Sequence, residues 1–429
     1  MKSRVISALV GGLIVLTGCT GQFEEPLPPR DKIYYPIGLE MHPNGRYLYT
    51  VNSNFDARYR ADQGGTVSVI DTETMQIVRD GSPNIPSFGA FLKLNADATK
   101  AYVTTRHNNE VIALDVSADG RTLSCARGTA APSANTTNCA VRRVPDEREG
   151  ALVGNDPFGI DVTTIMRTDP ESGEETPVDV VNLSYLRGNQ VTAMTFPGQT
   201  ISGATMRSAS LIAGGNQVVR RPGSLDFYVA GRSTNVVAIY QPFINDAGRV
   251  EAIVRRGAIE LSRAVEAVDA RGLTFSEDGK WLYVATRRPA ALHVVAIDRT
   301  EGLRHEVVDT ISLRRRPTDV VLHTTALGRE LVYVPSYQEG TIEVVDPMAR
   351  AIVDVIEVGP APYSMVIDRG EGRCEAPGQM CRAYISLFDD TGTRGVSCDE
   401  VPDQGCGAIA VIDLDPDSPR YHQVIKKIR

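Results

Sequence analysis

Residues 331–346 read LVYVPSYQEGTIEVVD, and residues 281–298 read WLYVATRRPAALHVVAID. In both stretches a tyrosine and a β-branched residue sit inside an alternating apolar run. A polar loop follows, and a second alternating run ends in aspartate. Alternation over four to eight residues, interrupted by turn residues, is typical of β-strands. The two stretches therefore predict a hairpin that the chain uses more than once.

The tyrosine phrase recurs along the whole chain. Its seven copies begin at Tyr49, Tyr102, Val180, Tyr228, Tyr283, Tyr333 and Tyr384. An apolar run and a turn rich in Asn, Asp and Gly precede most copies, and a third and a fourth run follow. Four short strands repeated seven times predict an all-β chain, a seven-bladed β-propeller of four-stranded antiparallel blades. The blade boundaries stay open between residues 120 and 260, where insertions dilute the repeat.

The repeat also predicts roles for single positions. Val67 and Val69 are expected to face one neighbouring blade, whereas Ser68 and Ile70 face the other, because side chains alternate along a strand. Trp281 is expected to pack in the core. The aspartate that ends the third strand is interpreted as a turn residue. This position holds Asp71, Asp115, Asp298, Asp346 and Asp413.

The N-terminus has the pattern of an export signal. Lys2 and Arg4 precede an apolar run, residues 6–16, which is shorter than the roughly 20 residues that span a bilayer. The run ends in LTGC, residues 16–19, which resembles the lipobox of bacterial lipoproteins. The resemblance implies cleavage of residues 1–18 and lipidation of Cys19, and an ordinary signal peptide is the alternative. Thr20, which is not Asp, favours the outer membrane by resemblance to the bacterial sorting pattern.

Residues 19–32 are predicted to be a flexible tether, and residues 33–429 the propeller. Beyond Cys19 the chain has six cysteines, an even number that suits disulfides in an oxidising compartment. Six cysteines allow fifteen complete pairing schemes, and proximity favours one scheme of three disulfides. These pair Cys125 with Cys139, Cys374 with Cys381, and Cys398 with Cys406. A zinc site is the alternative, but the spacing of the last four matches no zinc motif.

The frame around residues 36–52, with TVSVID at 66–71, resembles the YVTN-type seven-bladed β-propeller family. The resemblance is clearest at residues 36–80, 270–313 and 317–368. Relatives of this repeat include bacterial sugar lactonases, whose sequences contain a phrase like HPNGRYLY at 42–49. The resemblance therefore implies the fold and leaves lactonase activity as one alternative, since turn chemistry explains Pro43, Asn44 and Gly45 equally well.

Other site motifs are weak. The six histidines do not lie at metal-ligand spacing, and the chain contains no C-x-x-C-H or G-x-S-x-G motif. The aspartates at 389–390 and 413–417 do not reproduce a calcium-binding EF-hand loop. We therefore expect no metal and no cofactor, and we assign no catalytic residue. The formal net charge of −8 argues against nucleic acid as a partner.

Arginine placement is the most informative pattern. Loops between the second and third strands of a propeller emerge on one face, and in six of the seven blades they contain arginine. The candidates for a binding face are Arg58, Arg60, Arg106, Arg187, Arg232, Arg287, Arg288 and Arg394. The sixth blade lacks one, but residues 314–316 are three consecutive arginines before it. Such a ring suits a carboxylate- or phosphate-bearing partner. The alternative is a compositional bias, since the chain has 38 Arg and 7 Lys.

Three long insertions are further candidates, because long loops on a rigid scaffold tend to carry function. They cover residues 53–65, 121–156 and 388–407, and the first and last belong to blades that meet where the ring closes. We predict a monomeric, membrane-anchored binding or assembly module of the bacterial cell envelope, on the periplasmic or cell-surface side. Its partner is an envelope protein or an anionic ligand, bound through the loop face. The alternative is a periplasmic lactonase-like enzyme that acts in the central channel.

Overall fold

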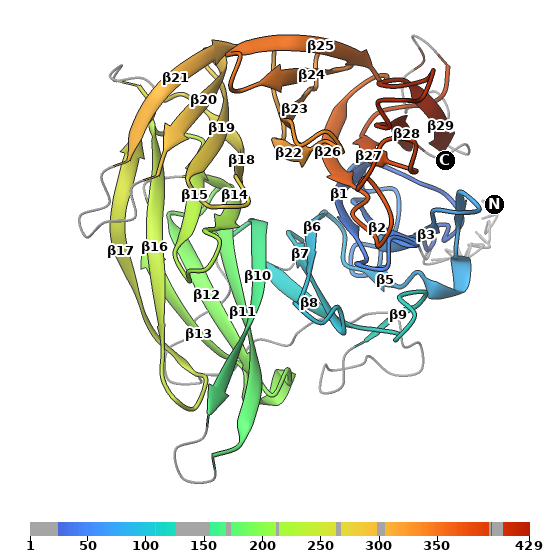
Figure 1. Cartoon of the computed structure of the whole chain (residues 1–429). Coiled ribbons are helices and arrows are strands. Elements are labelled where there is room, and N and C mark those ends of the chain that lie inside the picture. The colour runs from blue at the N-terminus through green and yellow to red at the C-terminus, as the bar shows by residue number, and fades with distance from the viewer. Residues whose placement is uncertain are drawn as a thin grey trace, which may run out of the picture.

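A computed structural model describes residues 25–107, 109–125, 155–168, 173–211, 214–262, 267–297, 305–393, 396 and 406–429. Seven antiparallel sheets surround a central axis (Figure 1). The predicted all-β, seven-bladed propeller with four-stranded blades is confirmed. The first strands of neighbouring blades contact one another around the axis, so each blade starts at the channel and runs outward.

The first three blades extend to Ser210. Blade 1 contains β1 (Pro36–Met41), β2 (Tyr47–Asn52), β3 (Gly65–Asp71) and β4 (Gln76–Ile77), with the short helix η1 (Arg79–Gly81) and β5 (Asn84–Ile85) beside β3. Blade 2 contains β6 (Gly89–Leu94), β7 (Lys100–Thr105), β8 (Glu110–Val116) and β9 (Leu123–Cys125). Blade 3 contains β10 (Pro157–Thr168), β11 (Glu175–Tyr185), β12 (Gln190–Pro197), η2 (Ile201–Gly203) and β13 (Thr205–Ser210).

The other four blades complete the ring. Blade 4 contains β14 (Gly215–Arg220), β15 (Phe227–Gly231), β16 (Val236–Ile244) and β17 (Val250–Glu260). Blade 5 contains β18 (Ala270–Phe275), β19 (Trp281–Arg287), β20 (Ala290–Ala296) and β21 (Glu306–Ser312). Blade 6 contains β22 (Val321–Thr324), β23 (Glu330–Ser336), β24 (Thr341–Asp346) and β25 (Ala351–Glu357). Blade 7 contains β26 (Pro362–Ile367), β27 (Arg382–Leu387), β28 (Ala408–Asp413) and β29 (Val424–Ile428).

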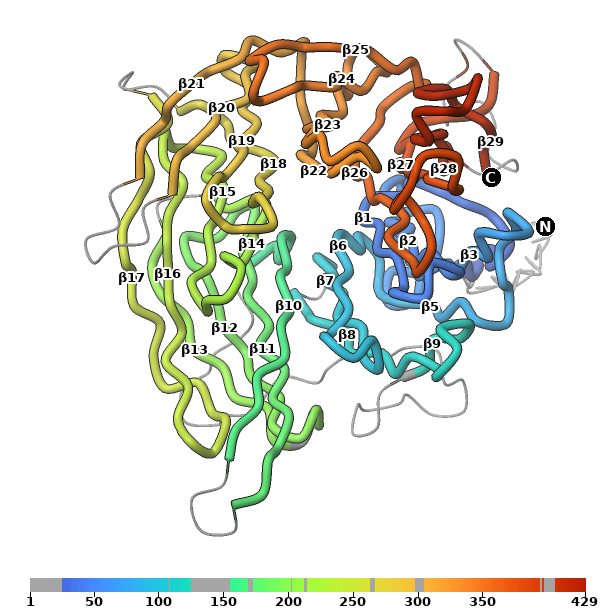
Figure 2. Tube along the Cα trace, viewed as in Figure 1, coloured from blue at the N-terminus to red at the C-terminus, as the bar shows by residue number. Residues whose placement is uncertain are grey.

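Blades 3 and 4 occupy the region that the sequence left open. They contain the three longest strands in the described chain, with 12 residues in β10 and 11 residues each in β11 and β17. Figure 2 shows these hairpins reaching beyond the rest of the ring. In the described part of this region the added residues lengthen strands of blades 3 and 4, whereas residues 126–154 lie outside the described residues.

The ring closes by packing between blades 7 and 1, and each blade takes its strands from consecutive sequence. Strand β1 contacts β26 and β27. The Ser386 hydroxyl donates to the Ile37 carbonyl at 2.8 Å, and the Arg382 guanidinium donates to the Thr72 carbonyl at 3.3 Å. The two ends of the propeller are thus tied by side chains as well as by apolar contact.

Side chains alternate across each blade as predicted. Val67 and Val69 lie in the core shared with blade 2, whereas Ile70 packs against blade 7. Trp281 is only partly buried, at the edge of the core between blades 5 and 6. Asp71 has the predicted turn role, since its carboxylate accepts the backbone N–H groups of Glu73 and Thr74. Asp346 makes the same two bonds in its own turn, and Asp298 lies outside the described residues.

The tyrosines of the repeated phrase fill the interfaces between blades. Six of the seven copies place a tyrosine there, and each is at most 2% exposed. The Tyr49 hydroxyl donates to the Gly120 carbonyl of blade 2 at 2.6 Å. The Tyr333 hydroxyl lies 3.0 Å from His422 Nε2 of blade 7. A buried aromatic ring contributes roughly 2–3 kcal/mol through removal from water, so the phrase is primarily a device for joining blades.

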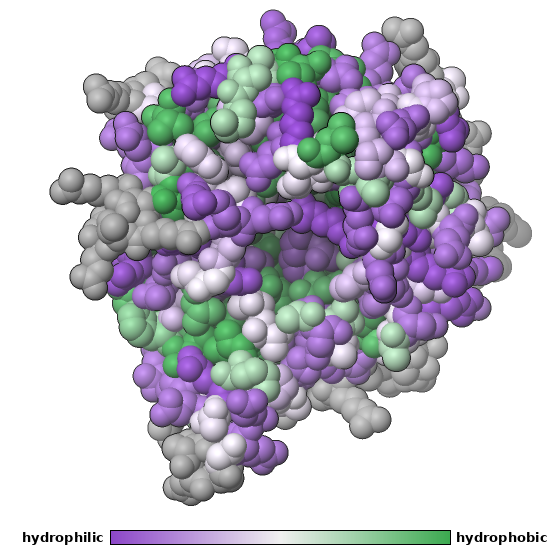
Figure 3. All heavy atoms as spheres, in the orientation of Figure 1, coloured by the Kyte–Doolittle hydropathy of each residue, from purple (hydrophilic) through white to green (hydrophobic). Residues whose placement is uncertain are grey.

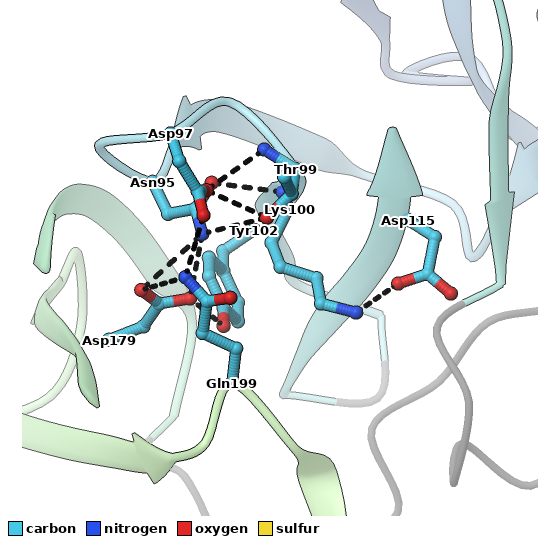
Figure 4. A network of polar contacts seen from close by, with 8 residues as sticks. All are labelled: Asn95, Asp97, Thr99, Lys100, Tyr102, Asp115, Asp179 and Gln199. Carbon is cyan, nitrogen blue, oxygen red and sulfur yellow. Dashed lines mark hydrogen bonds and ion pairs between the residues drawn. The ribbon is translucent and has the colours of Figure 1, made fainter. Parts of the chain in front are cut away.

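The interface between blades 2 and 3 adds a buried carboxylate (Figure 4). Asp179, fully buried, accepts hydrogen bonds from the Tyr102 hydroxyl at 2.8 Å and the Thr164 hydroxyl at 2.7 Å. The side-chain amides of Asn95 and Gln199 also donate to it, at 3.1 and 3.4 Å. Burial raises the pKa of Asp179, and these hydrogen bonds oppose that rise. The site ties two blades together through one acceptor.

The predicted disulfide between Cys374 and Cys381 is present. Cys406 is also disulfide-bonded, whereas its predicted partner Cys398 lies outside the described residues, as do Cys139 and the lipidation candidate Cys19. The pairing of Cys125 therefore stays a prediction. Among the described residues, no helix is long and apolar enough to cross a bilayer.

Candidate functional site

The mouth of the central channel is built from a backbone element that every blade repeats. In six blades the residue directly before the first strand has a positive φ, and in blade 6 Arg316 does so before the isolated bridge of Pro317 to Ser336, with φ between 45° and 76° throughout. Its carbonyl accepts the backbone N–H of the residue at or just after the end of the second strand, at 2.8–3.2 Å. The paired residues, carbonyl first, are Tyr35 and Ser53, Phe88 and Arg106, Asp156 and Leu186, Gly214 and Arg232, Asp269 and Arg287, Arg316 and Tyr337, and Ala361 and Phe388.

This element places two rings of seven residues around the mouth, with a constant backbone and variable side chains. Left-handed conformations cost energy in residues other than glycine, so their recurrence in six non-glycine positions indicates that the surrounding structure imposes them. Arginine follows the second strand in blades 2, 4 and 5, whereas blades 6 and 7 place Tyr337 and Phe388 there. The mouth therefore has a basic side and an aromatic side.

One arginine group lies between blades 2 and 3. Arg106 forms an ion pair with Asp156 through Nε, and its Nη2 donates to the second carboxylate oxygen at 3.3 Å. Arg187 Nε lies 3.6 Å from the same carboxylate. The Arg106 guanidinium also lies over the ring of Phe158, 6.0 Å from its centre. Asp156 thus holds Arg106 against the channel wall.

A second arginine group lies between blades 4 and 5. Arg271 contacts Asp269 at 2.7 Å through Nε and donates to its other oxygen at 3.1 Å. Arg232 and Arg288 approach the same carboxylate at 3.9 Å. Asp269 and Asp156 occupy equivalent positions, one residue before a first strand. The same pairing of an aspartate with the arginine of the preceding blade therefore occurs twice around the mouth.

Positive charge is in excess at this second group. A cleft of about 560 Å³ is bordered by Asp269 and by Arg271, Arg287, Arg288, Arg315 and Arg316. Arg287 donates through Nε to the Pro317 carbonyl, a neutral acceptor, at 2.9 Å. Burial and, after it, the neighbouring Arg271 lower the pKa of Arg287 to about 10. The same two causes lower the pKa of Arg232.

Tyr363, on β26, lies at the mouth, two residues after the left-handed Ala361. Burial raises its pKa, and the guanidinium groups of Arg271, Arg287, Arg106 and Arg232 all oppose that rise. Four arginines from blades 2, 4 and 5 are therefore close enough to act electrostatically on one phenol. We call Arg106, Arg232, Arg271 and Arg287 the arginine cluster.

The channel below the mouth has a mostly apolar lining, and several of its charged side chains have partners. The first strands enclose a cavity of about 480 Å³, and Figure 3 shows a central hollow with both hydrophilic and hydrophobic residues around it. Lys93 pairs with Glu40 at 2.6 Å. Asp319 accepts hydrogen bonds from the Gln217 side chain at 2.6 Å and from the Met365 N–H at 3.1 Å. Asp319 thus joins blades 4, 6 and 7, which is a structural task.

The structure brings together part of the predicted arginine set. Arg106, Arg232 and Arg287 converge on the mouth, and Arg187 and Arg288 reach its carboxylates from positions that are 82% and 76% exposed. Arg58 and Arg60 instead form local ion pairs on the loop of blade 1, with Asp56 at 2.8 Å and Asp62 at 3.4 Å. Arg394 lies outside the described residues, and Arg316 lines the cleft from blade 6.

Sequence reasoning missed Arg271 and Tyr363, which lie on first strands and not in loops. Both stand two residues after the left-handed position. The equivalent residues in other blades are Ile37, Ala90, Phe158, Asn216 and Thr318. Arg271 is the only charged residue among the seven equivalent positions, and this difference was the signal in the sequence that could have identified it.

A possible metal group lies elsewhere in the fold. His323 Nε2 is 3.8 Å from Cys381 Sγ, and Cys374 completes a set of three metal-binding side chains. The disulfide between the two cysteines uses both sulfur atoms, so this set cannot bind a metal in the oxidised protein.

Comparison with known proteins supports the architecture. No model of a known protein family matches the chain, and no curated protein matches it. Solved propellers do resemble it. The Pseudomonas aeruginosa periplasmic gluconolactonase PpgL is 18% identical with a TM-score of 0.53, over 77% of this chain and 87% of that one. Kuenenia stuttgartiensis hydrazine synthase is 14% identical with a TM-score of 0.53, over 89% and 96%. At these identities the likeness establishes the fold alone.

Proposed function

We propose that the protein is a binding module that holds a carboxylate or phosphate group in the arginine cluster. The excess of guanidinium groups around Asp269 carries this proposal. Burial and, after it, the charge of the neighbouring Arg271 lower the pKa values of Arg232 and Arg287. An anion among them would relieve that repulsion and accept charge-assisted hydrogen bonds from their planar N–H groups.

The N-terminal sequence supports a location for this module. The resemblance of residues 16–19 to a lipobox supports a location in the bacterial envelope, with attachment through lipid on Cys19 and a tether to residue 32. An anchored propeller would then present its mouth to ligands of the periplasm or the cell surface. Labelling with a radioactive fatty acid tests this part, because the label should disappear in Cys19→Ala.

Calorimetric titration of the folded propeller with acetate and with inorganic phosphate tests the binding proposal. We expect a single site with a Kd of roughly 0.1–1 mM for the preferred anion, since a few charge-assisted bonds contribute about 4–5 kcal/mol. Arg232→Gln should weaken binding about tenfold or more, whereas Arg60→Gln is the matched control and should leave it unchanged. Absence of binding by both anions would contradict the proposal.

Hydrolysis of a sugar lactone is the second candidate. Asp156 and Asp269 place two carboxylates at the mouth, next to guanidinium groups that suit a developing oxyanion. The structurally similar PpgL is described as a gluconolactonase. Gluconolactone hydrolysis above the spontaneous rate, abolished in Asp269→Asn, would establish this activity. Binding ranks first because arginines already occupy both carboxylates, which leaves neither well placed as a base.

A further inference from the structure

We propose that the ligand of the arginine cluster is an aromatic carboxylate, whose ring packs on an aromatic wall beside the arginines. The inference rests on the proposed function and adds the class of ligand. We define the aromatic wall as Tyr35, Phe55, Tyr337, Tyr363 and Phe388.

The aromatic wall is continuous from the rim to the arginine cluster. Phe55 lies 5.3 Å from Phe388 and Tyr35 lies 5.2 Å from Phe388, measured between ring centres. Phe388 in turn lies 6.3 Å from Tyr363, and Tyr337 lies 6.5 Å from Tyr363. Tyr363 lies 6.4 Å from Phe91, whose ring contacts Phe158, the residue under the Arg106 guanidinium. The wall therefore reaches the arginine cluster, where the anionic group would bind.

Tyr337 is a second point at which the aromatic wall approaches the arginine cluster. Burial raises its pKa, and Arg287 and Arg316 oppose the rise. Arg316 lines both the cleft that contains Arg287 and a neighbouring cleft that contains Tyr337. A ligand with its carboxylate among the arginines therefore has an aromatic surface within reach in the direction of blades 6 and 7.

Phe55 is the unusual member of the wall, because its side chain is 53% exposed. Its loop is nevertheless held in place. The Asn54 side chain donates to Ser87 Oγ at 2.7 Å and accepts the Tyr59 N–H at 3.1 Å, while the Tyr59 ring packs on Tyr34 at 5.5 Å. An exposed phenyl ring on a fixed loop is available for contact at little further entropic cost.

The chemistry of the wall favours a ring without hydroxyl groups. The side chains of Phe55 and Phe388 have no hydrogen-bond donor or acceptor, so their favourable contacts are with apolar surface and with other aromatic rings in edge-to-face geometry. A sugar acid shares the carboxylate and a flat C–H face, but its hydroxyl groups would lose water against these two rings. An aromatic carboxylate satisfies both halves of the mouth.

Calorimetric titration with phenylacetate, acetate, phenylacetamide and glucuronate tests the inference. Phenylacetate should bind about three- to tenfold more tightly than acetate, which is the increment of one aromatic contact. Phenylacetamide, which keeps the ring and lacks the charge, should not bind measurably. Phe55→Ala should reduce phenylacetate to the affinity of acetate and leave acetate unchanged. Leu327→Ala, which truncates a 73% exposed side chain in blade 6, is the control.

The outcomes separate the inference from the function on which it rests. Equal affinities for acetate and phenylacetate, or a Phe55→Ala variant that binds both as the native chain does, would overturn the aromatic ligand and keep the anion site. Tighter binding of glucuronate than of phenylacetate would overturn it in favour of a sugar acid. Failure of every anion to bind would overturn the proposed function itself.

Discussion

The blade interfaces and the channel mouth are built from the same repeat, yet they use it in opposite ways. At the interfaces, six of seven copies of the phrase place a tyrosine in the same buried position. At the mouth, the equivalent positions share a backbone hydrogen bond and differ in side chain, from Ser53 through Arg232 to Phe388. The interface repeats its chemistry, whereas the mouth repeats only its geometry.

This difference follows from what each region contacts. Every interface must fill the same space between two sheets, so one large side chain suits nearly all of them. The mouth faces solvent and any ligand, so its side chains are free to differ once the backbone element is formed. Side-chain variation at a repeated backbone position is therefore a guide to function in this fold.

The strongest test of the interface is removal of its buried acceptor. Asp179→Ala should destabilise the protein by about 3 kcal/mol or more, because four donors lose their shared partner in a buried site. Calorimetric unfolding measures the loss, with the exposed Asp246→Ala as control. A loss below about 1 kcal/mol would show that the network is incidental.

The strongest test of the mouth is Arg271→Met. It removes the guanidinium that lies 2.7 Å from Asp269, and we expect anion affinity to fall roughly 10- to 100-fold. Titration calorimetry with the preferred anion measures the change. Unaltered affinity in a folded variant would place the anion elsewhere.

A smaller effect distinguishes interfaces from one another. Tyr102→Phe should cost about 1.5–2 kcal/mol because its hydroxyl donates to a carboxylate, whereas Tyr49→Phe should cost about 1 kcal/mol because its acceptor is a neutral carbonyl. Urea unfolding of the two variants gives the ranking. The reverse order would mean that the other donors to Asp179 compensate fully.

The smallest effects are expected at the rim of blade 1. Arg58→Gln and Arg60→Gln break ion pairs with near neighbours in the same solvated loop, so stability should change by less than about 0.5 kcal/mol. Anion affinity should stay the same. A clear loss of affinity in either variant would extend the site to blade 1.

These contrasts mark how far sequence alone could go. The tyrosine phrase identified seven blades because the same physical need recurs with the same residues. Loop position also placed Arg106, Arg232 and Arg287 on one face. Loop position could not distinguish these three arginines from Arg58 and Arg60. An arginine reaches the mouth when it lies at the end of the second strand, and it does not when it lies further along a longer loop. Arg271 and Tyr363 were missed because the left-handed residues that set the register of the first strands have no common sequence.

The insertion loops gave a partly useful expectation. Residues 53–65 and 388–407 were predicted to meet where the ring closes, and Phe55 and Phe388 do contact each other there. The arginine cluster lies instead across the mouth, on blades 2, 4 and 5. The positions of the arginines in the sequence therefore predicted part of the arginine cluster, whereas the long loops predicted part of the aromatic wall.

The central claim is that the guanidinium groups of the arginine cluster repel one another and that a bound anion reduces this repulsion. The variant Arg287→Gln tests this claim most directly. The unfolding temperature should be measured for native chain and variant, each without and with a saturating concentration of the preferred anion. We predict that the variant is at least as stable as the native chain without the anion and shows a clearly smaller rise with it. A variant that is less stable without the anion and keeps the full rise would contradict the claim.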